Sequence, residues 1–172
     1  MRKLLLKEKK HEKMKKLSLI IQEIDQNCKH NLVFCSSIKQ ASRCMEMAKS
    51  MGLSASFISG KTPAKERDRL IREFTKGNIK HMFNVGVLTT GFDFPALDNI
   101  TLARPTLSLS LLYQLVGRGL RVDPGNPDKR CKVIDITENI KKLGRIETIR
   151  LDKDSTGYRD IVCTEKGEIS GK

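Results

Sequence analysis

Along this chain, short apolar runs alternate with longer stretches in which an apolar residue recurs every three or four positions. Short apolar runs are typical of buried strands, and the three-to-four spacing is typical of amphipathic helices. The pattern predicts a helix over residues 3–27 and then strands that alternate with helices. The strands are expected at 31–35, 53–58, 79–87, 99–103 and 131–136, and the helices over 38–51, between 62 and 77, and from 108 or 110 to near 117–119.

Residues at the helix ends support this prediction. Ser36 and Ser37 precede the helix at 38–51 and can either cap it or donate to a phosphate, while Thr62 is expected to cap the following helix, with Pro63 in its first position. Strands and helices that alternate with short connections predict a parallel sheet covered on both faces by helices, in the α/β class. Ligands of such sheets collect at the carboxyl ends of the strands, so we expect most functional loops there.

The length of 172 residues is sufficient for one domain with short appendages. Residues 1–27 are expected to form a basic N-terminal helix or connector, because the first half of this segment is too polar to pack deeply. Residues 28–140 would form the α/β domain. From about residue 141 the pattern gives no clear element, so residues 141–172 are expected to be a polar C-terminal extension.

The chain is strongly basic, with a net charge of +13. Residues 1–16 carry eight Lys or Arg against two Glu, so +6 of this charge lies near the N-terminus and +7 on the rest of the chain. Such a charge favours a polyanion such as nucleic acid as a partner. The alternative is a solubilising surface with one lysine-rich end.

Cysteine and apolar content argue against several classes of protein. The five cysteines are an odd number without a C-x-x-C pair, which argues against a disulfide framework and a complete zinc site, so no metal site is expected. No apolar run is long enough to span a membrane, and no signal peptide is visible. We therefore expect a cytoplasmic protein without a membrane partner.

The segment 114–121 carries the strongest chemical signal in the chain. Gln114, Arg118 and Arg121 are separated by four and three positions, which would place their side chains on successive turns if a helix continued through them. Guanidinium groups are permanently charged and grip phosphate oxygens in pairs. The alternative is a solvated helix end whose arginines complement the helix dipole.

A second polar segment, 91–95, follows a predicted strand. Gly91 permits close backbone approach, and Asp93 can accept hydrogen bonds from a ribose hydroxyl or hold an arginine, although Gly-x-Asp-x-Pro is also an ordinary turn. The hydroxyl groups of Thr89 and Thr90 could touch a nucleic-acid backbone or simply stabilise the loop. The chain has no G-x-x-x-x-G-K-[ST] loop, so it is not expected to hold a nucleotide by itself.

In this order, the segments resemble the second, C-terminal RecA-like domain of superfamily 2 (DEAD/DEAH-type) helicases. Residues 32–37 resemble motif IV, residues 84–95 resemble motif V, and residues 114–121 resemble motif VI, Q-x-x-G-R-x-x-R. The likeness extends over about residues 31–137. Their combination in this order is highly specific.

Finer features of the sequence bear on the type of helicase. The helix after the turn at Gly60 carries the Glu-Arg pair and the Phe of the family. Val85 stands where DEAD-box relatives place a threonine, so a phosphate contact by that residue is lost or passes to Thr89 or Thr90. Within the superfamily, the segments 88–93 and 117–121 look most like RadD-type DNA-repair helicases.

The resemblance implies a fold, an activity and roles for individual residues. The fold would be a RecA-like parallel sheet flanked by helices, and the activity that of an ATP-dependent helicase or translocase. ATP and Mg²⁺ would be held mainly by an N-terminal RecA-like domain, so the isolated chain is expected to be inactive. Arg121 would be the arginine finger on the γ-phosphate, with Arg118 and Gln114 completing the catalytic set and with Gly91 and Asp93 contacting the nucleotide.

The resemblance also implies a nucleic-acid-binding surface. The residues assigned to this surface are Ser36, Ser37, Gly60, Thr89, Thr90 and Arg104. DNA is the favoured partner and RNA the alternative, in keeping with the likeness to DNA-repair helicases. A different class of function is also considered, namely a stand-alone nucleic-acid-binding or adaptor module that keeps the fold without motor activity.

Overall fold

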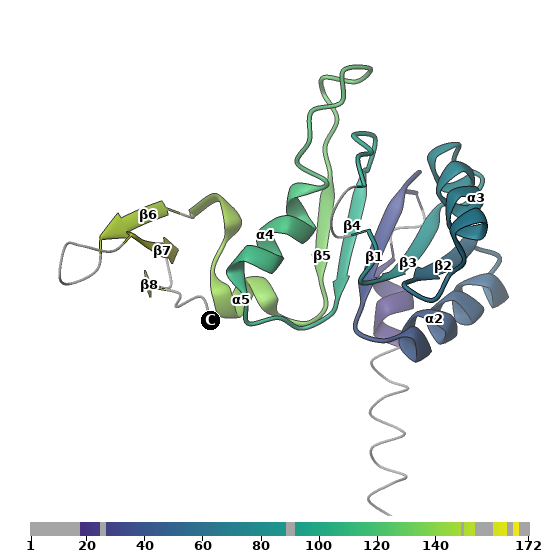
Figure 1. Ribbon diagram of the computed structural model, residues 1–172, viewed down its shortest axis with the longest axis horizontal. Coiled ribbons are helices and arrows are strands. Elements are labelled where there is room, and N and C mark those ends of the chain that lie inside the picture. The colour runs from purple at the N-terminus through teal and green to yellow at the C-terminus, as the bar shows by residue number, and fades with distance from the viewer. Residues whose placement is uncertain are drawn as a thin grey trace, which may run out of the picture.

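The structure is a computed structural model that describes residues 18–24, 27–88, 92–148, 150–153, 160–164 and 167–168, the last three ranges by their backbone only. Residues 18–23 are helical. The elements that follow (Figure 1) are β1 (Asn31–Cys35), α2 (Ile38–Ser50), β2 (Ala55–Ser59), α3 (Ala64–Thr75), β3 (His81–Val85), β4 (Asn99–Ala103), α4 (Leu109–Gly117), β5 (Lys132–Asp135), α5 (Asn139–Leu143), the 3₁₀ helix η1 (Ile146–Thr148), β6 (Arg150–Lys153), β7 (Asp160–Thr164) and β8 (Gly167–Glu168).

β1 is the central strand of a five-stranded parallel sheet with the order β2-β3-β1-β4-β5. It pairs with β3 and β4, so that Val33 lies beside Phe83 on one side and Thr101 on the other. Each of the five predicted strands is present, with ends that differ from the prediction by at most two residues. The parallel α/β sheet therefore confirms the predicted fold class.

Helices cover both faces of the sheet. Leu32 and Phe34 of β1 pack in a core with α3, α4 and α5, while Val33 and Cys35 pack in a second core with α2 and the helical residues near the N-terminus. These β1 side chains are almost fully buried. Burial of a Leu or Phe side chain stabilises a fold by about 1.5–3 kcal/mol. Because successive side chains of β1 point to opposite faces of the sheet, β1 contributes to the packing of both helical layers.

The segments on either side of the predicted domain contribute to these cores. Ile20, Ile21 and Ile24 are buried with β1 and α2, and Leu143 of α5 is buried in the opposite core. Beyond residue 141, where the sequence predicts no clear element, the structure contains η1 and a three-stranded antiparallel sheet, β6-β7-β8. The first part of the predicted N-terminal helix, residues 3–17, lies outside the described residues. The domain boundaries after residues 27 and 140 stay predictions.

The start of α3 differs from the prediction. The helix begins at Ala64, and its N-cap residue is Pro63, whose side chain makes no capping hydrogen bond. The Thr62 hydroxyl instead accepts a hydrogen bond from the Ser59 amide at 3.0 Å, and the Thr62 amide donates to the Ser59 carbonyl oxygen at 3.0 Å. Thr62 therefore closes the turn around Gly60 and does not cap the helix.

The parallel arrangement gives the sheet two different edges. The strand starts lie together at one edge, which we call the amino edge, and the strand ends lie at the other, the carboxyl edge. The chain between Val85 and Asn99 connects the end of β3 to the start of β4, so its two ends lie at opposite edges. The loop that joins α4 to β5 rises above the sheet in Figure 1 and leads into the start of β5.

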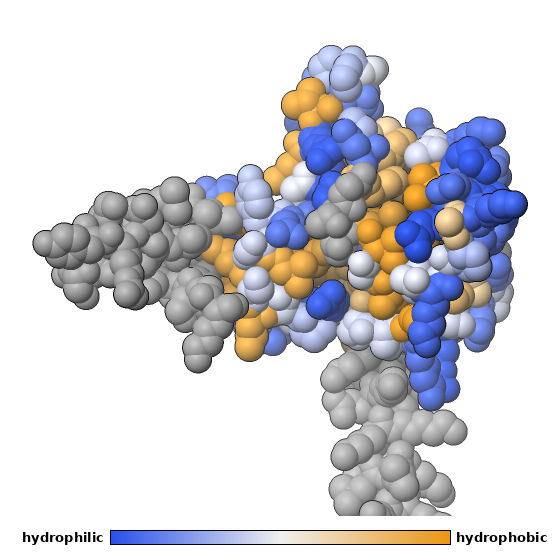
Figure 2. Space-filling view, viewed as in Figure 1, coloured by the Kyte–Doolittle hydropathy of each residue, from blue (hydrophilic) through white to orange (hydrophobic). Residues whose placement is uncertain are grey.

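The surface combines a broad polar area with a small apolar one. Figure 2 shows hydrophilic side chains over α3 and apolar side chains on the loop between α4 and β5. In that loop Leu120 and Val122 are 59% and 78% exposed. None of the helices in the described part of the chain combines the length and the apolar character needed to cross a bilayer.

Candidate functional site

The arginine segment follows α4 at the amino edge of the sheet. The Ser108 hydroxyl caps the start of α4 by accepting a hydrogen bond at 3.2 Å from a backbone amide of the first turn. The helix ends before Arg118, so Arg118 and Arg121 lie in the turn that follows, while Gln114 is exposed on the helix surface. The three side chains therefore do not occupy successive turns of one continuous helix.

Gly119 allows this turn to lie against the sheet. A Cβ atom at this position would be 2.3 Å from Cys131 Sγ and 2.9 Å from Ile100 Cδ1. Ile100 belongs to β4 and Cys131 directly precedes β5, so the turn packs against the starts of two neighbouring strands. Only glycine permits such a close approach of the backbone.

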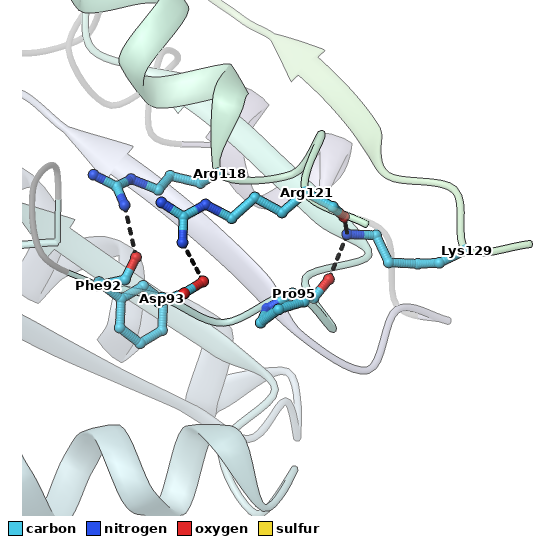
Figure 3. A network of polar contacts seen from close by, with 6 residues as sticks. All are labelled: Phe92, Asp93, Pro95, Arg118, Arg121 and Lys129. Carbon is cyan, nitrogen blue, oxygen red and sulfur yellow. Dashed lines mark hydrogen bonds and ion pairs between the residues drawn. The ribbon is translucent and has the colours of Figure 1, made fainter. Parts of the chain in front are cut away.

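The two arginines contact the segment 92–95 (Figure 3). Arg118 Nη1 donates a hydrogen bond to the Phe92 carbonyl oxygen at 2.7 Å, and Arg121 forms an ion pair with Asp93. Burial, with a smaller contribution from the positive charge of Arg121, lowers the pKa of Arg118 from its usual value. The Arg121 and Asp93 side chains are 41% and 67% exposed, so water screens their ion pair, which contributes at most about 1 kcal/mol.

Aromatic rings fix the segment that carries Asp93. The Phe92 and Phe94 rings lie 6.1 Å apart, and their centroids are 6.4 and 5.8 Å from that of Phe74 in α3. His30, which precedes β1, meets the Phe94 ring edge-on at 4.8 Å. Burial is the main cause of a lowered pKa of His30, so this imidazole is neutral at neutral pH. The rings on either side of Asp93 thus anchor the backbone while its exposed carboxylate faces Arg121.

Lys129 belongs to this site, although the sequence does not single it out. Its ammonium group donates hydrogen bonds to the carbonyl oxygens of Pro95, Gly119 (2.9 Å) and Arg121 (3.0 Å). Figure 3 shows the contacts with Pro95 and Arg121. Lys129 lies in a turn-rich loop, where a lysine is most often a solvated surface charge. No sequence signal distinguishes it from the other basic residues of the chain.

The serines after β1 make local hydrogen bonds at the carboxyl edge. Ser37 caps α2 by accepting a hydrogen bond from the Gln40 amide at 3.2 Å. The amide and the hydroxyl of Ser36 both donate to Gln40 Oε1 at 2.8 Å. Gln40 Nε2 donates to the Ala103 carbonyl oxygen at 3.3 Å, which links the end of β1 to the end of β4. The capping interpretation therefore has direct geometric support for Ser37, while Ser36 bonds to the Gln40 side chain.

Other predicted residues are spread along the same edge. Gly60 follows β2 on the surface, and a Cβ atom there would meet nothing within 4 Å, so packing does not require glycine. Arg104 follows β4, and its carbonyl oxygen accepts a hydrogen bond from Asn139 Nδ2 at 3.0 Å. The predicted residues that lie outside the described residues are Thr89, Thr90 and Gly91.

The structure thus separates the predicted residues into two groups. The arginine group, meaning Arg118, Arg121 and Asp93, meets at the amino edge. The second group follows strand ends at the carboxyl edge and consists of Ser36, Ser37, Gly60 and Arg104. A cleft of about 530 Å³ also opens at the carboxyl edge, beside Ser36. The second group lies at the carboxyl edge, where the sequence predicts most functional loops, whereas the arginine group lies at the amino edge.

The arginine group suits an anionic ligand and does not suit a metal ion. Two guanidinium groups accompany a single carboxylate, and within the described residues no group of three or more His, Cys, Asp or Glu side chains is placed to hold a metal ion. Burial raises the pKa of the Cys44 and Cys131 thiols to about 12 and about 11, so both are protonated at neutral pH. The two guanidinium groups therefore fit contact with a phosphate.

Comparison with known families identifies the family of this chain. The model of the helicase conserved C-terminal domain family matches residues 12–123. The chain belongs to this family. It is 31% identical over 150 residues to "Putative ATP-dependent helicase IRC3" of Saccharomyces cerevisiae, with 86% of this chain and 22% of that protein covered. It is 33% identical over 117 residues to "Putative mitochondrial ATP-dependent helicase irc3" of Schizosaccharomyces pombe, with 68% of this chain and 19% of that protein covered. The chain spans about a fifth of the length of these relatives.

Solved structures share the fold. The C-terminal domain of the DEAD-box protein Dbp5 matches with a TM-score of 0.62 and 22% sequence identity, over 73% of this chain and 74% of that one. At this level of identity the likeness concerns the fold alone. The predicted RecA-like fold of a helicase C-terminal domain is confirmed, and the resemblance to RadD-type helicases stays a prediction.

Proposed function

We propose that this domain is the second RecA-like half of an ATP-dependent superfamily 2 helicase or translocase and that it works with an N-terminal RecA-like ATPase domain. The main support is the position of Arg118 and Arg121 beside Asp93 and the Phe92 carbonyl oxygen. Permanently charged guanidinium groups stabilise the charge of a phosphoryl group during its transfer. The relation to the IRC3 proteins, which are named as ATP-dependent helicases, points the same way.

In this proposal Arg121 is the arginine finger. Its side chain is partly exposed, and water screens its ion pair with Asp93, so a γ-phosphate can replace the carboxylate at little cost. Arg118 is held by its backbone hydrogen bond and adds positive charge nearby. Gln114 completes the catalytic set, and Gly91 and Asp93 contact the nucleotide. An arginine finger increases the rate of phosphoryl transfer by about 10³–10⁵.

The surface around Arg121 suits a partner domain. The exposed apolar side chains of Leu120 and Val122 flank it in the chain, and Figure 2 shows apolar surface on this loop. Arginine and apolar residues are characteristic of protein interfaces. We therefore assign the amino edge to the N-terminal RecA-like domain, which would hold ATP and Mg²⁺, and expect no ATP hydrolysis by this chain alone.

We assign nucleic acid to the carboxyl edge. The residues proposed to face its backbone are Ser36, Ser37, Gly60, Thr89, Thr90 and Arg104. The net charge of +13 favours such a polyanion. DNA is preferred because of the resemblance to DNA-repair helicases, while solved structures of Dbp5 bound to RNA make RNA the alternative. A role in DNA repair and a cytoplasmic location are further predictions from the sequence.

ATP hydrolysis by a protein that contains both RecA-like halves tests the proposal. We expect turnover only when both halves are present, with greater stimulation by single-stranded DNA than by single-stranded RNA. This chain alone should bind nucleic acid and show no turnover. If the two-domain protein lacks turnover and this chain still binds nucleic acid in a salt-sensitive manner, the function is that of a stand-alone binding module.

A further inference from the structure

Lys129 joins two segments that are distant in the sequence. Its ammonium group donates to the Pro95 carbonyl oxygen in one segment and to the carbonyl oxygens of Gly119 (2.9 Å) and Arg121 (3.0 Å) in the other. An ammonium group has three N–H donors and no acceptor, so these contacts match its full donor capacity. Lys129 is partly buried, whereas its neighbours Asp128 and Arg130 are exposed.

An ordered turn brings Lys129 to this position. The Asn126 amide donates to the Asp123 carbonyl oxygen at 3.0 Å, and the Lys129 amide donates to the Asn126 carbonyl oxygen at 3.0 Å. Asp123 Oδ1 also accepts a hydrogen bond from the Gly125 amide at 3.0 Å. The base of the lysine side chain is therefore held by its own loop, and its tip can fix the backbone of the two segments it contacts.

These two segments carry the groups proposed to act on ATP. Asp93 lies two residues before Pro95, and Arg121 both accepts a hydrogen bond from Lys129 through its backbone and forms the ion pair with Asp93 through its side chain. Figure 3 shows the ammonium group between the two backbones, on the side away from the guanidinium groups. Lys129 thus acts on the backbone and leaves the guanidinium group of Arg121 available for another anion.

We infer that Lys129 is a positioning residue of the ATPase site, which sets the backbone of residues 92–95 and 118–121 so that Arg121 reaches the γ-phosphate. This inference rests on the proposed function of Arg121. A displacement of about 1 Å in a catalytic group can cost about 10²-fold in rate. Loss of the ammonium group should therefore lower kcat for ATP by about 10- to 100-fold. The KM should change little, because the other RecA-like half is proposed to hold most of the nucleotide.

Kinetics of the two-domain protein test this role. Lys129→Met removes the donors and keeps a long side chain, whereas Lys129→Arg keeps a positive donor group and should restore most of the lost kcat. Arg130→Met removes the neighbouring exposed charge and serves as the matched control, with kcat unchanged. The decisive comparison is made in an Arg121→Ala background. If Lys129 acts through Arg121, Lys129→Met should lower kcat by less than about twofold in that background, because the effects of coupled residues are not additive.

Amide hydrogen exchange in the same protein without nucleotide gives a reading that does not depend on turnover. Lys129→Met should accelerate exchange in residues 92–94 and 118–122 and leave exchange in β1 and β3 unchanged. If the wild-type protein has no ATPase activity, the proposed function fails, and this exchange result still decides whether Lys129 holds the two segments. Unchanged exchange, or equal losses of kcat with and without Arg121, would overturn the inference.

Discussion

Substitution of Gly119 by Ala tests the close contact on which the arginine turn depends. The added Cβ atom would lie 2.3 Å from Cys131 Sγ, 2.9 Å from Ile100 Cδ1 and 3.0 Å from Cys131 Cβ. Favourable contacts between such atoms are about 3.5–4 Å, and rotation of the thiol does not relieve the contact with Cys131 Cβ. Overpacking of this kind costs about 1–3 kcal/mol, so the free energy of unfolding should fall by that amount.

Unfolding in urea measures this change, with Gly117→Ala as the control. Gly117 lies in the same segment, and a Cβ atom there would meet nothing within 4 Å. Since Gly117 is the last residue of α4, Gly117→Ala should leave stability unchanged or raise it by up to about 1 kcal/mol. Replacing Cys131 by Ala in the Gly119→Ala protein removes Sγ and should recover part of the loss. Equal stabilities of Gly119→Ala and Gly117→Ala would refute the packing argument.

Two other residues give predictions that need only the folded domain. Ser37→Ala should lower the free energy of unfolding by about 1 kcal/mol, because α2 loses its N-cap, whereas Ser37→Asp keeps an acceptor there; equal stabilities in urea would contradict the capping role. The lowered pKa of His30 means that folding favours the neutral imidazole and that the unfolded chain takes up a proton first. Stability should therefore fall as the pH drops below about 6.5, the usual pKa of histidine. Urea unfolding between about pH 7.5 and pH 5.5 measures this fall, which should be smaller in His30→Leu. If the free energy of unfolding falls equally with pH in the wild type and in His30→Leu, His30 is not the cause.

The sequence predicts the central sheet well because its strands are short and strongly apolar. β1 and β4 begin and end where the apolar runs do. The three-stranded sheet after residue 148 was not predicted, because β6 and β8 are short and mostly polar and the apolar run in β7 is only three residues long. The cap of α3 was also misplaced, since Thr62 satisfies its hydroxyl within the preceding turn. Local hydrogen bonds of this kind compete with capping and cannot be told apart from it in a sequence.

The candidate site was predictable in its residues and not in its location. The spacing of Arg118 and Arg121 and the preceding Asp93 are visible in the sequence. In the structure Arg121 pairs with Asp93, and Arg118 donates to the carbonyl oxygen of the preceding Phe92. The arginines reach the amino edge because α4 runs back from the end of β4, whereas Asp93 reaches it through the connection between β3 and β4, which no local pattern reveals. Lys129 was missed for a similar reason, because its three acceptors are backbone carbonyls from two other segments. The pattern of side chains in a sequence does not indicate which backbone carbonyl oxygens accept hydrogen bonds.

The role of Arg121 as the arginine finger can be measured as the rate of ATP hydrolysis in a single turnover by the two-domain protein with Arg121→Ala. We predict that this rate falls by about 10³–10⁵ while the dissociation constant for ATP changes by less than about tenfold, since most contacts with ATP are assigned to the N-terminal half. Arg130→Ala, which removes an exposed charge nearby, should leave both quantities unchanged. A single-turnover rate for Arg121→Ala equal to that of the wild type would contradict the assignment of Arg121 as the arginine finger.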